Sequence, residues 1–229
     1  MREIYLKGEY VIKNPTYHVE DSPWKAQQIF RMVNKHKLQP VTVCEIGCGA
    51  GEILRQLQQY FSKETLFHGY EISPQGYALC KQRENERLKF YCQDFLRIDT
   101  SPYDILLCID VFEHVEDYMG FLKQLRQRAT YKIFHIPLDM SVLKVLRGRP
   151  ILDRRTEHGH LHYFNKDTAL QTLKDTGYEI MDWFYTCTID LDRARLPRIA
   201  NIPIKMFSFI NADLTVRIFG GHSLLVLAK

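Results

Sequence analysis

The sequence predicts an α/β fold built on a doubly wound, mostly parallel sheet. Short apolar runs alternate with segments of helical periodicity between residues 41 and 176, and such alternation is typical of parallel strands joined by right-handed crossovers. A glycine-rich turn follows the first apolar run, and acidic residues follow several of the others. In folds of this class ligands bind at the carboxyl ends of the strands, so we expect the functional site there.

The expected elements follow one another in order along the chain. Pro40 precedes a first strand at 41–46, and a helix follows at 51–61. Further strands are expected at 66–71, 88–93, 103–109 and 131–136, with helices at 75–85, 117–129 and 166–176. Two more apolar runs, 178–189 and 222–228, are candidate strands. Before the first strand, Asp21 and Pro23 predict a capped helix that continues through residues 25–37.

Composition sets the broad class. The chain has 229 residues, of which 45% are apolar and 25% charged, so we expect residues 1–229 to form a single domain around one core. No run approaches the roughly 20 apolar residues that a membrane span needs, and the N-terminus does not look like a signal peptide. We therefore expect a soluble, cytoplasmic protein. The six cysteines lack CxxC spacing, which favours reduced thiols over zinc ligands or disulfides. The oligomeric state cannot be predicted.

The glycine-rich turn indicates what is bound. Gly47, Gly49 and Gly51 have no Cβ, so a ligand can approach the backbone closely. The helix expected after them presents unpaired N–H groups. A dinucleotide-binding turn carries its third glycine at the sixth position, where this chain has Glu52. Because that carboxylate would repel a pyrophosphate, we expect a nucleotide-type cofactor without one.

The pattern Glu45-x-Gly47-x-Gly49-x-Gly51 resembles motif I of the class I S-adenosylmethionine (SAM) methyltransferases. Acidic residues also follow the next three strands in the order that this family shows: Glu71, then Asp94 beside Phe95, then Asp110 in a segment that resembles motif IV. The resemblance implies SAM as cofactor and S-adenosylhomocysteine as product. It also implies a Rossmann-like, three-layer fold with seven strands, of which the last is reversed.

The resemblance also implies which residues contact the cofactor. Glu45 suits the cationic side of SAM, a carboxylate at Glu71 can accept both ribose hydroxyls, and Asp94 would accept from the adenine amino group. The full expected set is Glu45, Gly47, Gly49, Gly51, Glu71, Ile72, Asp94, Phe95 and Asp110. Tyr10, Tyr17, His18 and Trp24 either reach this pocket from the N-terminal segment or pack on the sheet edge.

Long insertions flank the expected core. We divide the chain into an N-terminal cap (1–39), a SAM-binding core (40–137) and substrate-side insertions at 138–162 and 191–221. Each insertion carries five Lys and Arg residues, against three acidic residues in the first and two in the second. Long loops in a compact domain usually carry function. Apolar residues 202–210, with Arg193, Arg195, Arg198, Lys205 and Arg217 around them, favour a lipid-linked, acidic or membrane-surface substrate, or else form an ordinary covering helix.

His114 and Asp110 are the candidate catalytic residues. The sulfonium methyl of SAM is already activated, so the protein must position a nucleophile and remove a hydroxyl proton. His114 lies just after the fourth strand and has a suitable ordinary pKa of about 6.5. It acts as a base, or it only packs the helix that follows. The chain has no Asn-Pro-Pro-Tyr or Pro-Cys segment there, which argues against methylation of base amino groups or of cytosine C5.

A divalent metal is an alternative that we do not favour at this stage. If a helix begins at Asp110, the side chains of Asp110, Glu113 and His114 share one face. His158, His160 and His162 arrive from the first insertion, and His162 is the one best aligned. Such a set suits a divalent metal and is similar to that of metal-assisted small-RNA 2′-O-methyltransferases and ubiquinone-pathway O-methyltransferases. The histidines could equally order the loop through hydrogen bonds to the backbone.

Three classes of function are compatible with these residues. The favoured one is a SAM-dependent methyltransferase that acts on an oxygen of a small, lipid-linked or glycan-type acceptor. A metal-assisted RNA-terminal 2′-O-methyltransferase is the second, and RNA is therefore not excluded as a partner. The third is a non-catalytic SAM-binding protein, because a fold does not by itself imply a function.

Overall fold

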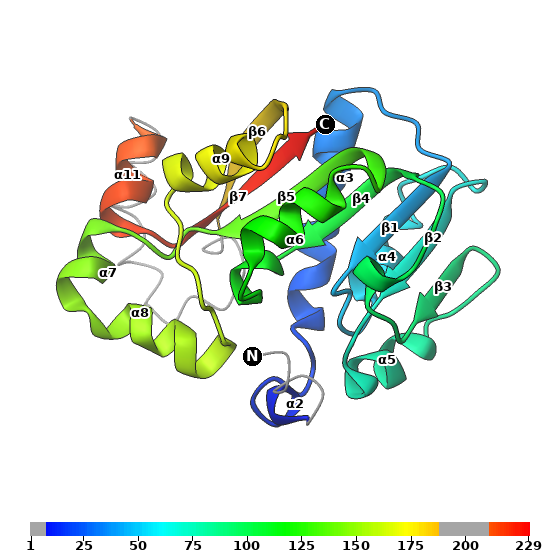
Figure 1. Cartoon of the computed structure of the whole chain (residues 1–229), viewed down its shortest axis with the longest axis horizontal. Helices are drawn as coiled ribbons and strands as arrows, with labels where there is room; N and C mark the ends of the chain where they lie inside the picture. The colour runs from blue at the N-terminus through cyan, green and yellow to red at the C-terminus, as the bar shows by residue number, and fades with distance from the viewer. Residues whose placement is uncertain (1–7, 188–210) are drawn as a thin grey trace.

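The computed structural model describes residues 8–187 and 211–229, which build a seven-stranded sheet with helices on both faces (Figure 1). The strand order is β3-β2-β1-β4-β5-β7-β6. The strands are β1 (Thr42–Ile46), β2 (Leu66–Tyr70), β3 (Leu88–Tyr91), β4 (Tyr103–Ile109), β5 (Ala129–Pro137), β6 (Ile180–Cys187) and β7 (His222–Ala228). The first five pair in parallel, and β7 runs antiparallel to both β5 and β6. The predicted sheet with a reversed last strand is confirmed.

Helices cover both faces of the sheet and make three layers. The longer ones are α3 (Ser22–Lys35), α5 (Pro74–Lys81), α6 (Tyr118–Leu125), α9 (Lys166–Asp175) and α11 (Ala212–Phe219). Short ones are α2 (Glu9–Lys13), α4 (Glu52–Leu57), α7 (Val142–Arg147), α8 (Arg149–Asp153), the π-helix η4 (Arg154–His158), and the 3-10 turns η1 (Val19–Asp21), η2 (Phe95–Arg97) and η3 (Phe112–His114). In Figure 1, α6 and α9 lie in front of the sheet and α3 lies behind it.

The apolar runs form strands because both of their faces are buried. Along β4, Ile105 and Leu107 belong to the core beneath α3 and α4, while Leu106 and Cys108 belong to the core beneath α6 and α9. Side chains alternate between the two faces of a strand, so a continuous apolar run fills both cores at once. This arrangement explains why the central strands could be recognised without an alternating pattern.

Local sequence signals set several helix starts. The Ser73 hydroxyl accepts from the Gly76 N–H at the start of α5, and Asn165 forms a reciprocal capping box at the start of α9. Asp21 is the N-cap residue of α3, as expected, but it does not cap the helix with its side chain. Helix α3 begins at Ser22 with Pro23 in its first turn, and the Asp21 side chain accepts no capping hydrogen bond.

The two insertions differ in how much of them is described. The first forms α7, α8 and η4 beside the carboxyl ends of the strands. Most of the second, including Arg193, Arg195, Arg198, Lys205 and residues 202–210, lies outside the described residues. Arg217 on α11 forms ion pairs with Asp167 and Asp213. Among residues 8–187 and 211–229, no helix is long and apolar enough to cross a membrane.

Candidate functional site

A cavity of about 850 Å³ lies at the carboxyl ends of β1, β2, β4 and β5, which is a typical volume for a small-molecule site. The glycine turn after β1 lines the cavity, and helices α7 and η4 contribute Lys144, Arg154 and His158 to its lining. The N-terminal segment closes the cavity with Tyr10, Tyr17, His18 and Trp24. These four aromatic side chains, whose place was left open by the sequence, therefore line the pocket.

The glycine turn is locked to Glu71 by backbone hydrogen bonds. Glu71 Oε2 accepts from the Gly49 N–H and Oε1 from the Ser73 N–H, each at 2.8 Å. Burial raises the pKa of the Glu71 carboxyl, and these N–H donors oppose that rise. Gly51 has φ of +75°, and a Cβ there would lie 2.4 Å from the ring of Phe90. The turn thus depends on glycine at this position.

Glu45 lies near the end of β1 with its carboxylate enclosed. The residue is 2% exposed, and its Oε2 has no hydrogen-bond partner within the described residues. Burial raises the pKa of Glu45 well above its ordinary value, against the attraction of Lys25. A buried acceptor without a partner is costly, so this oxygen is suited to a donor supplied by a ligand.

Asp110 is held between two basic side chains. Its Oδ2 accepts from Lys25 Nζ at 2.7 Å, and its Oδ1 lies 2.6 Å from His135 Nδ1. Burial alone would raise the pKa of Asp110, but His135 and Lys25 outweigh it and hold the pKa below its ordinary value. Asp110 has a φ of 54°, a backbone conformation that costs about 1–3 kcal/mol in a residue other than glycine. The two basic partners hold the carboxylate in place despite that strain.

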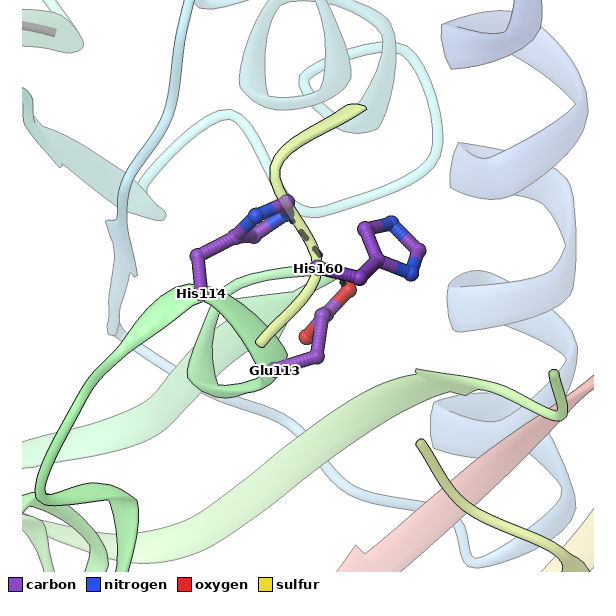
Figure 2. A group of neighbouring side chains, drawn as sticks. All are labelled: Glu113, His114 and His160. Carbon is purple, nitrogen blue, oxygen red and sulfur yellow. Dashed lines mark ion pairs between the residues drawn. The ribbon is translucent and has the colours of Figure 1, made fainter. Parts of the chain in front are cut away.

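Glu113, His114 and His160 form a compact cluster on the same side of the cavity (Figure 2). One donor atom from each, a carboxylate oxygen and two ring nitrogens, lies within 4.8 Å of the others. Glu113 and His114 come from η3, and His160 comes from the loop after η4. The N–H groups of Leu161 and His162 both donate to the Glu113 carbonyl, at 2.8 and 3.1 Å, and this anchors the loop.

His114 is a neutral imidazole with a defined tautomer. Its Nδ1 lies 3.1 Å from the Gly159 carbonyl oxygen, which can only accept, so Nδ1 carries the hydrogen. Burial lowers the pKa of His114 to about 4, with a further contribution from His160. At neutral pH the lone pair is therefore on Nε2, and the residue lines the cavity.

The remaining residues expected at the cofactor site also border the cavity. Gly47, Gly49, Ile72, Asp94 and Phe95 all line it. Asp94 caps η2 by accepting from the Leu96 N–H, and Phe95 packs against Tyr70 with ring centroids 4.8 Å apart. The fold therefore brings the predicted cofactor residues to one cavity, except Gly51, which is not among the residues that line it.

Two expectations from charge and spacing need correction. Glu52 does not present an unbalanced charge, because Arg55 and Arg83 hydrogen-bond its carboxylate. Burial would raise the pKa of Glu52, but these partners lower it to about 2. The expected helical face of Asp110, Glu113 and His114 does not form, because Asp110 precedes the 3-10 turn η3. His162 Nε2 lies 2.9 Å from the Val115 carbonyl oxygen, so His160 takes the place in the cluster expected for His162.

Sequence reasoning missed Lys25, His135 and Asp139. Lys25 lies on α3, far along the chain from the strands, and His135 lies inside the apolar run of β5. No spacing links either to Asp110. The pairing of Ile109 with His135 in adjacent parallel strands brings β5 to Asp110, and the order of these strands could have suggested that contact.

A family described as a methyltransferase domain matches residues 17–182. The chain belongs to this methyltransferase family. That match spans the glycine turn, most of the cavity lining and the cluster. The recognition of a class I SAM-dependent methyltransferase, with SAM as methyl donor, is confirmed. The enzyme class expected from the sequence is confirmed with it.

Individual relatives are distant. The methyltransferase is 26% identical over 87 residues to the malonyl-[acyl-carrier protein] O-methyltransferase of Bacillus anthracis, and the match covers 37% of this chain and 32% of that protein. It is 19% identical over 186 residues to the ubiquinone biosynthesis O-methyltransferase of Rickettsia canadensis, covering 77% and 72%. The chain thus spans about a third of the first relative's length and nearly three quarters of the second's.

The fold is similar to that of a solved SAM-dependent methyltransferase from Geobacter sulfurreducens in complex with S-adenosyl-L-homocysteine. The two structures have a TM-score of 0.64 at 14% identity, and 96% of each chain is covered. At this identity the similarity concerns the fold alone. In this methyltransferase, that fold places the glycine turn and the carboxyl ends of the parallel strands at one edge of the sheet.

Proposed function

We propose that this methyltransferase transfers the methyl group of SAM to a hydroxyl oxygen of an amphipathic acceptor, either lipid-linked or of glycan type. The observation that carries the proposal is the neutral imidazole of His114, with its Nε2 lone pair at the cavity. The methyl group moves in one displacement, in which the C–S bond breaks and a C–O bond forms. The sulfonium becomes the neutral thioether of S-adenosylhomocysteine, and the hydroxyl must lose its proton.

The cofactor end of the cavity has a place for each part of SAM. The unpartnered Oε2 of Glu45, within the described residues, suits the cationic side of the cofactor. Each carboxylate oxygen of Glu71 accepts one backbone N–H and keeps acceptor capacity for a ribose hydroxyl. Asp94 faces the adenine amino group in this arrangement, with Ile72 and Phe95 as apolar walls. Asp110 acts as a positioning residue through Lys25 and His135.

Oxygen is the favoured nucleophile because the proton it loses has a receiving site. His114 lies just after β4, at the same edge of the sheet as the glycine turn. Its depressed pKa keeps it neutral at physiological pH, and a neutral imidazole can assist loss of a proton. The two relatives described above are named as O-methyltransferases, which supports the same choice.

The acceptor end of the cavity favours an anionic, amphipathic molecule. The single carboxylate of Asp139 faces two cations, Lys144 at 3.3 Å and Arg154 at 3.4 Å. The three side chains together therefore carry a net positive charge. Four large apolar side chains on α7 and α8 are at least half exposed: Val142, Val145, Leu146 and Leu152. Exposed apolar groups beside basic ones are typical of contact with lipid or amphipathic ligands.

An acceptor screen with labelled SAM tests the proposal. The panel contains hydroxylated lipids, lipid-linked sugars, free glycans, catechols and short RNA, each at the same concentration. We expect label to appear in a hydroxylated amphipath. Labelled RNA termini would identify an RNA 2′-O-methyltransferase, and SAM binding without transfer to any member would identify a non-catalytic SAM-binding protein; either result contradicts the proposal.

A further inference from the structure

We infer that Glu113, His114 and His160 form a binding site for one divalent first-row cation at the acceptor end of the cavity. The three side chains supply one carboxylate and two imidazoles, a donor set suited to Mn²⁺, Fe²⁺ or Zn²⁺. The catalytic use of this site rests on the proposed function, whereas the site itself rests on the geometry and burial of its side chains.

The donor atoms are already close together. One atom from each residue lies within 4.8 Å of the others, and Figure 2 shows the Glu113 carboxylate beside the two rings, with its ion pair to His114 drawn as a dashed line. Metal–ligand bonds of about 2.0–2.2 Å allow two ligand atoms to be separated by at most about 4.4 Å. The donor atoms therefore need to approach one another by at most about 0.4 Å to reach the separation that one cation allows.

The carboxylate of Glu113 is buried beside His114, whose Nε2 lies 3.8 Å from Oε1. The residue is 1% exposed, and neither Oε1 nor Oε2 has a hydrogen-bond partner in the described part of the chain. Burial raises the pKa of Glu113 well above its ordinary value, and the charge of Asp110 adds to the effect. Buried charges are otherwise paired or bound to metal, and a cation would satisfy both oxygens.

Both imidazoles are held in the tautomer that a metal requires. His114 donates from Nδ1 to the Gly159 carbonyl, and His160 donates from Nδ1 to Asp139 Oδ2 at 2.6 Å. In the neutral form of each ring, this hydrogen bond leaves the lone pair on Nε2. Metal-binding histidines usually donate their other N–H to a carbonyl or a carboxylate in this way.

Asp139 is itself fixed, which gives His160 a rigid support. Burial alone would raise the pKa of Asp139, but His160, Lys144 and Arg154 lower it to about 2. The carboxylate is thus ionised at neutral pH and remains an acceptor for His160. The ligands and their supports come from η3, the loop after η4, and the segment after β5.

This set differs from the metal alternative that the sequence suggested. Asp110 is engaged by Lys25 and His135 instead of facing the cluster, and the His162 ring contacts the Val115 carbonyl. His160 is the loop ligand. Within the proposed function, a cation held by these residues would lower the pKa of an acceptor hydroxyl. His114 would then act as a metal ligand in place of a direct base, and the hydroxyl proton would pass to water.

Calorimetric titration of chelator-treated protein with Mn²⁺ and then with Zn²⁺ tests the site without reference to activity. We expect one equivalent of cation to bind, with an affinity at least tenfold lower in Glu113→Gln and in His160→Gln. Asp139→Asn should weaken binding by roughly 10–100-fold, because it removes the support of His160. His162→Gln is the matched control and should bind as the unaltered protein does.

Each variant is also titrated with SAM, so that loss of the fold is recognised as loss of both ligands. Absence of one-to-one cation binding by the unaltered protein, or equal losses in His160→Gln and His162→Gln, would overturn the site. Cation binding without methylation of any hydroxyl acceptor would leave the site and refute the proposed function. Full turnover in the presence of chelator, without cation binding, would refute the cation site and leave the proposed function.

Discussion

Lys25 on α3 and Asp110 after β4 form a 2.7 Å ion pair that joins the N-terminal helix to the edge of the sheet. The two side chains are only 17% and 25% exposed. Burial lowers the pKa of Lys25, but the charge of Asp110 and its hydrogen bond leave that pKa raised. The pair therefore holds α3, and with it Trp24, against the cavity.

Breaking this pair should destabilise the protein and weaken cofactor binding together. Lys25→Met leaves the Asp110 charge with His135 as its remaining basic partner. We expect the free energy of unfolding to fall by about 2 kcal/mol, a value between those typical of exposed and of buried ion pairs. Lys35→Met is the control, because the Lys35 side chain is 60% exposed in its pair with Asp182. Urea denaturation measures both variants, and equal losses would contradict the account.

Glu71 should contribute to SAM affinity directly. Glu71→Gln keeps the shape of the side chain but removes the charge that accepts from the Gly49 and Ser73 N–H groups. We expect calorimetry to show SAM binding weakened by roughly 1–3 kcal/mol. Glu64→Gln, at an exposed position after α4, should leave SAM affinity unchanged. Tight NAD binding with no SAM signal would refute the assigned cofactor site.

Gly51 should tolerate no side chain. In Gly51→Ala the new Cβ meets the Phe90 ring and Cys80, in addition to the strain of a φ of +75°. Gly148 has a φ of +66°, and a Cβ added there would meet nothing within 4 Å, so Gly148→Ala carries the backbone cost alone, about 1–3 kcal/mol. Thermal unfolding should place Gly51→Ala well below Gly148→Ala. Similar melting temperatures would show that the turn has more room than described.

The buried histidines should make stability depend on pH. Burial lowers the pKa of His114 to about 4 and that of His158 to about 4, against about 6.5 in the unfolded chain. Between these values the unfolded state binds more protons, so the free energy of unfolding should rise with pH from about 4 to 6.5 and level off above.

Removal of one such histidine gives the control for this pH dependence. In chelator-treated His114→Asn, the slope of the free energy of unfolding against pH should fall by up to about 1.4 kcal/mol per pH unit, which corresponds to one proton. Urea denaturation at a series of pH values measures it. A slope unaffected by the substitution would show that His114 is protonated normally in the folded state.

The apolar surface of α7 should matter for the acceptor and not for the cofactor. We expect the double change Val145→Ser and Leu146→Ser to raise the KM for an amphipathic acceptor several-fold, because both side chains are more than half exposed on the helix that contributes Lys144 to the cavity. Val41→Ser, at the amino end of β1, removes a similarly exposed apolar group on the opposite edge. Equal effects of the two changes on KM would exclude a specific contact.

The cofactor end of the site could be predicted from the sequence because its residues stand in short, recognisable segments at the ends of strands. Gly47 and Gly49 follow a buried strand directly, and Glu71 ends the next strand along the chain. Parallel strands bring such residues to one edge of the sheet, independently of the conformation of the connecting loops. The reversed strand β7 was expected only from the family resemblance, because apolar runs do not reveal strand direction.

The acceptor end could be predicted only in part. The sequence offered a metal set of Asp110, Glu113, His114 and one loop histidine only as an alternative that was not favoured, with His162 as the best-aligned histidine. Which histidine joins the cluster depends on the loop anchored at the Glu113 carbonyl and on Asp139, which fixes His160. Asp110 was expected beside the cluster, and the long-range partner Lys25 shows why no local pattern could place it.

Identification of the methylated atom tests the central claim most directly. The unaltered enzyme is given tritiated SAM with a hydroxylated amphipath from the screen and with its deoxy analogue, and the product is analysed by mass spectrometry and NMR. The account predicts label in an O-methyl group of the hydroxylated acceptor and none in the deoxy analogue. Label on nitrogen or carbon, or equal labelling of the two compounds, would contradict it.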